Sequence, residues 1–414
     1  MPNTTLHTRS GTNKICHLEK TWRWFGPNDA VKLGMLRQIG GEGIVTSLHD
    51  VPNGAVWTHE KIMQMKDMIE SHGMRWSVVE SLPVSESIKY AGEDRDRLID
   101  NYISSLTALG QAGIGTVCYN FMPVIDWIRT DLEHPLEDGT STLYFDYARF
   151  AYFDMHILGR EAAAEDYPAD ILDKVRKMED PMTESEKEKL IDTIIGRTQG
   201  FVSGNFNSSD NNPVQKFRDL LSLYDGVTKE NLRDNLKYFL EAIMPTCDRY
   251  GIDMCIHPDD PPMGVLGLPR IVSDREDISW LLECVRNPHN GLTFCAGSLS
   301  AGRHNDITAM AREFAGRTRF VHLRSCEIMD NGDFMEAPHT GGRADLVELV
   351  RIFENEDRNI PMRVDHGKMM LDDGHKGYNP GYGFHGRMLA LGQVGGMMCA
   401  VRSYGRFCNQ GKIN

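Results

Sequence analysis

Short apolar segments rich in β-branched and aromatic residues recur along the chain, each followed by a turn and a stretch with helical periodicity. Because parallel strands need helical crossovers, this alternation predicts an α/β fold. Eight such segments favour a closed (β/α)8 TIM barrel over an open doubly wound sheet, and the first lacks the GxGxxG turn of nucleotide-binding open sheets. The predicted strands are TWRWFG (21–26), GIVTSL (43–48), WSVVESL (76–82), TVCYNF (116–121), DMCIHP (253–258), LTFCAG (292–297), RFVHLR (319–324) and MRVDHG (362–367).

The interval from about residue 125 to 225 interrupts this rhythm with a charged helical stretch and a polar, turn-rich patch. We interpret it as a helical insertion after the fourth strand, because long loops without structure of their own are rare in compact domains. Residues 1–18 are polar and aperiodic, which predicts a flexible extension, and residues 19–414 are predicted to form a single barrel domain. Amphipathic helices are predicted at 59–72, 94–110 and 229–250.

The formal net charge of −14 argues against a nucleic-acid partner, because such a field repels phosphodiester backbones. A small anionic substrate remains compatible, since it needs only local positive charge inside a site. The first residues lack the apolar core of a signal peptide and no run is long enough to span a bilayer, so we expect a cytoplasmic protein without a membrane partner. The nine cysteines include no CxxC pair, which predicts reduced thiols.

Four consecutive predicted strands carry a metal-binding residue type near the carboxyl end, where barrel enzymes place their active residues. Side chains alternate along a strand, so one residue from each strand can point to a common centre. Taken singly, a cysteine or histidine is more often a packed core residue, and it is the coincidence of four that predicts a divalent metal site. Two imidazoles, a thiolate and a carboxylate suit Mn(II), Fe(II), Co(II) or Zn(II) better than Mg(II) or Ca(II). The candidate ligands are His257, Cys295, His322 and Asp365.

Two candidates for proton transfer or anion binding lie beside this predicted site. His366 cannot share the inward direction of its neighbour Asp365, which suits an acid or base rather than a fifth ligand, with a loop or capping histidine as the alternative. The glycine-rich loop GYNPGYGFHGR (377–387) enters the last predicted helix, whose first N–H groups can hold an anion. Its polar side chains, which include Tyr382 and Arg387, give that loop functional capacity.

Other residues at the strand ends are candidates for substrate binding. Arg324 lies two residues past His322 and could bind a carboxylate of the ligand in bidentate fashion. The alternative is a salt bridge to a side chain of a neighbouring strand. The first four strands supply a polar and aromatic set suited to a polyhydroxylated ligand, although the tryptophan could equally be barrel packing. This set includes Trp24, His49, Glu80 and Asn120.

In their order and spacing these segments resemble the D-mannonate dehydratase family, of the xylose-isomerase-like barrel type, from about Thr21 to the C-terminus. The motifs that carry the resemblance are TWRWFGPND, VTSLHDVPNGAVW, VVESLPVSESIK, VCYNFMPVIDW, CIHPDDPP, TFCAGSLS, FVHLRS, RVDHG and GYGFHGR. The resemblance implies a barrel hydro-lyase that converts D-mannonate to 2-keto-3-deoxy-D-gluconate in hexuronate (glucuronate) breakdown. We expect Mn2+ or Fe2+ as the metal and a homodimer as the assembly. The implied metal ligands are His257, Cys295, His322 and Asp365, and the implied catalytic pair is His366 and Tyr382.

This reaction needs a base for the C2 proton and an acid for the departing C3 hydroxyl, while a metal stabilises the developing charge. We assign Tyr382 to proton removal and His366 to protonation of the leaving hydroxyl, and the reverse assignment remains open. A metal-dependent sugar isomerase or epimerase is the nearest alternative, although such enzymes favour carboxylate-rich sites over the thiolate of Cys295. A sugar-binding barrel with a structural metal is the non-enzymatic alternative and would have a closed coordination sphere.

Overall fold

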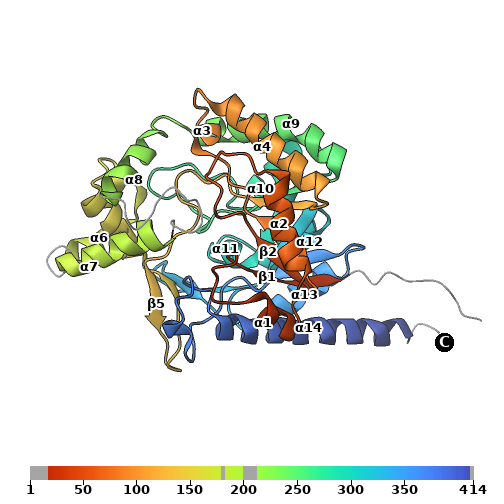
Figure 1. Cartoon of the computed structure of the whole chain (residues 1–414). Coiled ribbons are helices and arrows are strands. Elements are labelled where there is room, and N and C mark those ends of the chain that lie inside the picture. The colour runs from red at the N-terminus through yellow and green to blue at the C-terminus, as the bar shows by residue number, and fades with distance from the viewer. Residues whose placement is uncertain (1–16, 179–181, 199–211, 411–414) are drawn as a thin grey trace, which may run out of the picture.

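The computed structural model of this chain describes residues 17–178, 182–198 and 212–410, with side chains up to residue 403. Eight parallel strands close into a barrel in the order β1-β12-β9-β8-β7-β4-β3-β2, with helices packed around it (Figure 1). The predicted (β/α)8 TIM barrel is therefore confirmed. The barrel strands are β1 (Leu18–Arg23), β2 (Gly43–Thr46), β3 (Arg75–Glu80), β4 (Thr116–Tyr119), β7 (Asp253–Ile256), β8 (Asn290–Cys295), β9 (Thr318–His322) and β12 (Ile360–Arg363).

Every barrel strand overlaps a predicted strand but ends at least two residues before the predicted end. The polar residues at the predicted tips leave the strand ladder and begin the loops that carry the site. At the other end, Leu18 already pairs with Ile360 in the barrel, while residues 1–16 of the predicted extension lie outside the described residues.

The predicted helices at 59–72, 94–110 and 229–250 are confirmed as α2 (His59–Glu70), α4 (Arg95–Gln111) and α9 (Lys229–Tyr250). Helix α9 starts at a capping box of Thr228 and Asn231 and ends at Gly251, whose φ of +66° is the left-handed conformation that glycine adopts without strain. None of the helices in the described ranges is long and apolar enough to cross a bilayer. The remaining barrel helices are α1 (Leu33–Gln38), α3 (Glu86–Lys89), α10 (Arg275–Cys284), α11 (Ala296–Ser300), α12 (Ile307–Phe314), α13 (Leu346–Glu354) and α14 (Phe384–Gln410).

Alternate residues of the barrel strands face two different apolar layers. One set packs against the surrounding helices in the main hydrophobic core. The other set forms a small separate cluster, which we assign to the barrel interior because its members alternate with core residues along their strands. Two positions further along β3, β4, β7 and β9, the same parity places Glu80, Asn120, His257 and His322 above this interior layer. The interior cluster consists of Val45, Val78, Cys118, Cys255 and Phe320.

The insertion after β4 begins with a β-hairpin, so a purely helical insertion is not what the structure contains. Strands β5 (Asp131–Pro135) and β6 (Ser141–Phe145) pair with a second hairpin, β10 (Cys326–Ile328) and β11 (Phe334–Glu336), in a four-stranded antiparallel sheet of order β10-β11-β6-β5. The second hairpin comes from a further excursion after β9 that the periodicity analysis did not predict.

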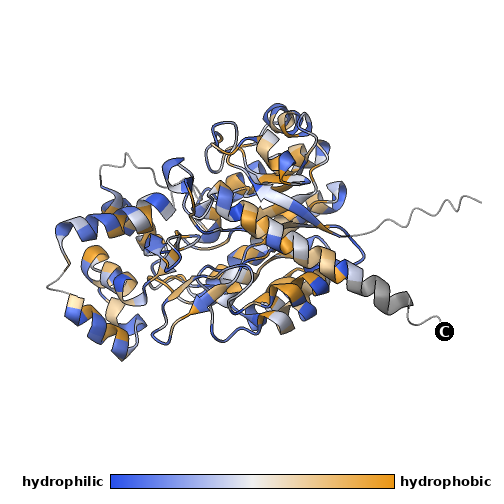
Figure 2. Cartoon of the chain, turned by 90° about the horizontal axis from the view of Figure 1, so that it is seen from below, coloured by the Kyte–Doolittle hydropathy of each residue, from blue (hydrophilic) through white to orange (hydrophobic). Residues whose placement is uncertain are grey.

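The helical part of the insertion follows this sheet and gathers on one side of the barrel (Figure 1). These helices show mixed hydrophilic and hydrophobic faces (Figure 2), and their apolar residues form a second core, separate from that of the barrel, with Phe145 and Phe334 of the sheet. The insertion therefore has a hydrophobic core of its own. Its two strands pair with the distant hairpin after β9 to form one sheet. The helices are α5 (Tyr147–Tyr152), α6 (Ala169–Met178), α7 (Glu184–Ile191) and α8 (Pro213–Ser222).

Candidate active site

A cavity of about 590 Å3, its open mouth included, lies at the carboxyl ends of the barrel strands. This is the end of a (β/α)8 barrel where active sites lie. The cavity is polar, since most of the side chains that line it are charged or hydrogen-bonding. The predicted site residues among its lining are Glu80, Asn120, His257, Arg324, Asp365, His366 and Tyr382.

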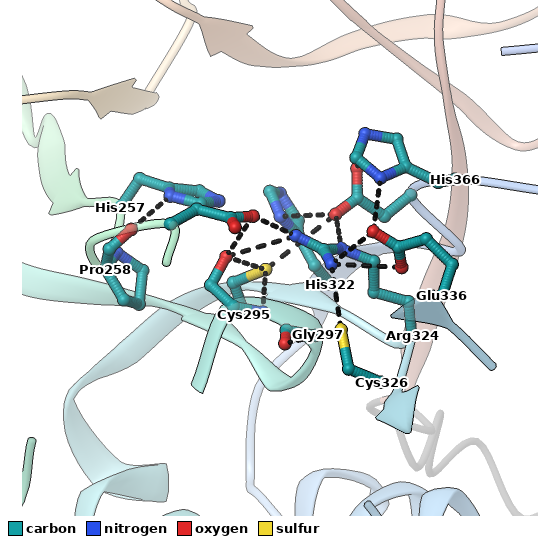
Figure 3. A network of polar contacts seen from close by, with 12 residues as sticks. His257, Pro258, Cys295, Gly297, His322, Arg324, Cys326, Glu336 and His366 are labelled. Atoms are coloured by element: carbon teal, nitrogen blue, oxygen red, sulfur yellow. Dashed lines mark hydrogen bonds and ion pairs between the residues drawn. The ribbon is translucent and has the colours of Figure 1, made fainter. Parts of the chain in front are cut away.

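Three of the four predicted metal ligands converge on one another beside this cavity, and His257 is the one of the three that lines it. His257 directly follows β7, Cys295 ends β8 and His322 ends β9. Their ligand atoms all lie within 4.8 Å of one another (Figure 3). Nδ1 of His257 contacts the carbonyl oxygen of Pro258 at 2.7 Å, which leaves Nε2 available as a ligand. Nδ1 of His322 is buried and has no hydrogen-bond partner among the described residues. A buried imidazole nitrogen without a partner, beside a thiol and a second imidazole, fits a divalent metal of borderline softness.

Without a metal, the two imidazoles of the cluster differ in their affinity for a proton. Burial alone would lower the pKa of His257, but its interactions with Cys295, together with those of Cys118 and Glu80, outweigh burial and raise that pKa to about 10. Burial lowers the pKa of His322 well below its ordinary value, so this imidazole is neutral and retains a lone pair. A metal would therefore compete with a proton at His257 and would meet no such competition at His322.

Asp365, the predicted fourth ligand, lies beside the cluster rather than within it. Its Oδ2 is 3.8 Å from Sγ of Cys295 and 3.7 Å from Nδ1 of His322. Burial would raise the pKa of this carboxyl, but the charges of Arg363, His366 and Arg324 together outweigh burial and hold the pKa well below its usual range. Asp365 is therefore an ionised carboxylate adjacent to Cys295 and His322, and its role as a ligand stays a prediction.

Arg324 is buried and forms the centre of an ion-pair network (Figure 3). Nε donates to Oδ2 of Asp365 at 2.5 Å, Nη1 donates to Glu336 at 2.9 Å, and Nη2 donates to Asp260. Arg129 binds the same Asp260 and Glu336. Binding of a substrate carboxylate by Arg324 stays a prediction, and it would require one of these carboxylates to release the guanidinium.

Gly297 provides the space that Arg324 occupies. A Cβ atom at residue 297 would lie 2.1 Å from Cγ and 2.4 Å from Nε of Arg324. Because the guanidinium is held by three carboxylates, the side chain cannot move aside cheaply. We expect Gly297→Ala to lower the free energy of unfolding by about 1–3 kcal/mol, the usual cost of overpacking, as measured by urea denaturation. Gly316→Ala, where a Cβ meets no atom of the described residues within 4 Å, is the control; equal stability of the two variants would contradict this role.

The predicted catalytic pair lies together at the cavity wall. The rings of His366 and Tyr382 are 5.1 Å apart in an edge-on arrangement, and Tyr382 also meets Phe25 edge-on at 4.9 Å. Nδ1 of His366 is 3.2 Å from Oε1 of Glu336. Burial raises the pKa of Tyr382, although Arg363 partly offsets the shift. The two side chains are therefore close enough to act on one bound molecule.

The structure does not bring Trp24, His49 or Arg387 to the lining of this cavity. Trp24 packs in the core outside the barrel, and its Nε1 donates to the carbonyl oxygen of Val31 at 3.0 Å. His49 is exposed beside Phe25. Arg387 is buried and donates to backbone carbonyl oxygens, including that of Tyr382 at 2.8 Å, so it supports the tyrosine loop.

The alternation of side chains along the strands explains why Trp24 does not reach the cavity. It also identifies two inward-facing residues that the sequence analysis did not propose for the site. Arg23 pairs with Val45 of the interior layer, so Arg23 points into the barrel and Trp24 points out of it. Arg363, two residues before Asp365, has the same inward parity; it donates to Asp365, to Glu80 at 2.8 Å and to His322 at 3.1 Å. Consistent application of the two-residue period would have identified both arginines.

Together these features define a (β/α)8-barrel protein with a candidate metal centre and a neighbouring histidine–tyrosine pair at the carboxyl ends of its strands. The sequence profile described as D-mannonate dehydratase (UxuA) matches residues 18–407. The mannonate dehydratase of Marinomonas sp. (strain MWYL1) is 43% identical over 93% of this chain and 100% of its own length, and that of Chromohalobacter salexigens is 42% identical over 93% and 99%. The crystal structure of mannonate dehydratase from Streptococcus suis serotype 2 superposes with a TM-score of 0.75 at 32% identity, covering 94% of this chain and 96% of that one. This chain belongs to the D-mannonate dehydratase family, whose members are hydro-lyases.

Proposed function

We propose that this chain dehydrates D-mannonate to 2-keto-3-deoxy-D-gluconate in the cavity at the carboxyl ends of its barrel strands. One observation carries this proposal beyond family membership. The cluster of His257, Cys295 and His322 adjoins a cavity that is also lined by His366 and Tyr382. A candidate metal site and two groups able to transfer protons are the parts that elimination of water from a hydroxy acid requires.

In this proposal His257, Cys295 and His322 hold a divalent metal, Mn2+ or Fe2+, with Asp365 as a fourth ligand. A metal bound there supplies Lewis acidity, which stabilises the negative charge that develops when the C2 proton is removed. Nε2 of His322 accepts from Nε of Arg363 at 3.1 Å and lies 3.4 Å from Oε1 of Glu80. With Nδ1 as the ligand, Nε2 would carry the ring proton, so Arg363 would have to withdraw its N–H from this nitrogen and Glu80 would accept the proton in its place.

The geometry favours His366 as the base and Tyr382 as the acid, the reverse of our first assignment. With Nδ1 directed at Glu336, the imidazole of His366 has Nε2 available to take the C2 proton, and the Glu336 carboxylate stabilises the imidazolium that results. Burial raises the pKa of Tyr382, so its phenol keeps its proton at neutral pH and can donate it to the departing C3 hydroxyl. Both roles are part of the proposal.

The proposal is tested by stripping the protein of metal, adding single metals, and following the products formed from D-mannonate and from free aldoses. We expect 2-keto-3-deoxy-D-gluconate from D-mannonate with Mn2+ or Fe2+, and no product with chelator or with Mg2+, which suits an all-oxygen site better. Isomerised or epimerised aldoses would favour the isomerase alternative. Tight metal binding without turnover of any sugar would favour the non-enzymatic one.

Replacing Arg324 by lysine separates two roles for this residue. The ammonium keeps a charge but loses the planar fork that joins Asp260, Glu336 and Asp365. If Arg324 positions Asp365, kcat should fall about tenfold with little change in KM, because the substrate does not touch the altered group. A raised KM with unchanged kcat would instead assign Arg324 to the substrate carboxylate. Steady-state kinetics on the metal-loaded variant distinguish the two.

A further inference from the structure

Three arginines of the described part of the chain line the cavity, and two of them are fully engaged in ion pairs within the protein. The guanidinium of Arg324 binds Asp365, Glu336 and Asp260. The guanidinium of Arg363 binds Asp365, Glu80 and the His322 ring. Neither can accept a negatively charged ligand without giving up an ion pair inside the protein, so the third arginine is the one whose charge is available.

That third residue is Arg23, the last residue of β1. It points into the barrel and is only 8% exposed. Its guanidinium lies 5.1 Å from the centre of the Phe25 ring and makes no hydrogen bond to any other residue that the structure describes. Nη1 is buried and without a hydrogen-bond partner within the described part of the chain. Burial lowers the pKa of Arg23, and the nearby Glu80 only partly offsets the shift.

Glu80 does not neutralise Arg23, although it lies on the same side of the cavity. Oε1 of Glu80 accepts from Arg363 at 2.8 Å, and no ion pair joins Glu80 to Arg23 among the described residues. Oε2 of Glu80 is buried and also without a hydrogen-bond partner in this part of the chain. The wall formed by β1 and β3 therefore presents one buried donor group and one buried acceptor that the protein itself leaves unsatisfied.

Buried polar groups in native proteins are almost always paired, and a buried charge without a partner is costly. An arginine whose donors face a cavity in this state is suited to a ligand that brings both negative charge and two acceptor oxygens. A hydroxyl would satisfy the geometry of one donor but would leave the charge without compensation. A carboxylate satisfies both requirements.

We propose that Arg23 binds the carboxylate of the sugar acid, and that Oε2 of Glu80 accepts a hydrogen bond from a hydroxyl of the same molecule. This assignment rests on the proposed function, because it takes an aldonate as the ligand. It makes Arg23 the residue that selects sugar acids over neutral sugars and alditols. A neutral ligand of the same length would leave the guanidinium buried and unpaired.

The test compares two ligands that differ only at C1 and cannot lose water, a 3-deoxy-aldonate and the corresponding 3-deoxy-alditol. Binding of each to the metal-loaded protein is measured by calorimetry. We expect the wild type to prefer the aldonate. In Arg23→Gln the affinity for the aldonate should fall by about 10- to 100-fold, the range for a lost hydrogen bond to a charged group, while the affinity for the alditol stays unchanged. Arg23→Lys should show a smaller loss, because the point charge survives.

Arg286→Gln is the control for net charge, since this side chain is 83% exposed and, among the residues that the structure describes, forms an ion pair with Glu283 alone. It should bind both ligands as the wild type does. If Arg23→Gln kept the wild-type ratio of aldonate to alditol affinity, the assignment of Arg23 would be overturned while the proposed function stood. A wild type that bound no aldonate and did not turn over D-mannonate would overturn both. If Arg23→Gln lost alditol binding as well, Arg23→Lys decides: an unchanged ratio in that variant overturns the assignment, and a reduced ratio with intact alditol binding supports it.

Discussion

Replacing Cys295 by serine should leave a folded barrel that binds its metal at least ~100-fold more weakly than the wild type. A hydroxyl is a poor substitute for a soft, anionic thiolate, and a structural four-ligand site binds zinc with roughly 10–16 kcal/mol, so one ligand is worth about 3 kcal/mol. That difference corresponds to roughly 100-fold in the dissociation constant. The metal content of the purified variant and its competition with a chelator measure the loss, and dehydration should fall in parallel.

The chain offers a closely matched control in Cys255. This residue is also a fully buried thiol, it lies on the neighbouring strand β7, and it belongs to the apolar interior layer below the cluster. Cys255→Ser introduces the same chemical change in the same barrel and should keep wild-type metal content. Equal metal content in both variants would show that Cys295 is a packed core residue, and a loss in both would point to general damage.

Much of the fold could be predicted from the sequence, because strand and helix periodicity are local signals. The eight barrel strands and the helices α2, α4 and α9 follow from the spacing of apolar residues alone. The hairpins of the added sheet were missed, although each has a strong local signal: Asp138-Gly139 turns β5 into β6, and Asn331-Gly332 turns β10 into β11. What no local signal reveals is that these two hairpins, far apart in the sequence, pair with each other.

The site, like the fold, has parts that local sequence signals predict and parts that depend on long-range contacts. His257, Cys295 and His322 could be found because each is a recognisable ligand type at the end of a consecutive barrel strand. The ion pairs around them depend on long-range contacts, such as that of Arg324 with Glu336 from the second hairpin, and composition cannot reveal them. Arg23 could have been predicted as a site residue, because the alternation of side chains along its strand directs it into the barrel. The sequence-based prediction named its aromatic neighbour Trp24 for substrate binding instead.

The proton-transfer roles of His366 and Tyr382 can be separated by isotope exchange. If His366 removes the C2 proton, His366→Asn should lose dehydration by roughly 100-fold or more and should also lose exchange of the C2 hydrogen in deuterated water. If Tyr382 protonates the leaving hydroxyl, Tyr382→Phe should lose dehydration to a similar extent and still exchange the C2 hydrogen, because the base remains in place. Product formation and deuterium incorporation, measured by NMR on the metal-loaded variants, give the two readouts independently.

Two substitutions outside the cavity lining serve as matched controls. The pattern of exchange decides which residue of the pair is the base and which is the acid. Tyr378→Phe removes a hydroxyl from the same glycine-rich loop, and His375→Asn removes an exposed imidazole; both variants should turn over normally. Exchange that survives in His366→Asn and vanishes in Tyr382→Phe would restore our first assignment, with the tyrosine as base. That outcome would also require the phenol to lose its proton despite the burial that raises its pKa. The exchange measured in Tyr382→Phe therefore tests both the electrostatics of the cavity and the assignment of base and acid. Wild-type turnover in both variants would remove the pair from the mechanism.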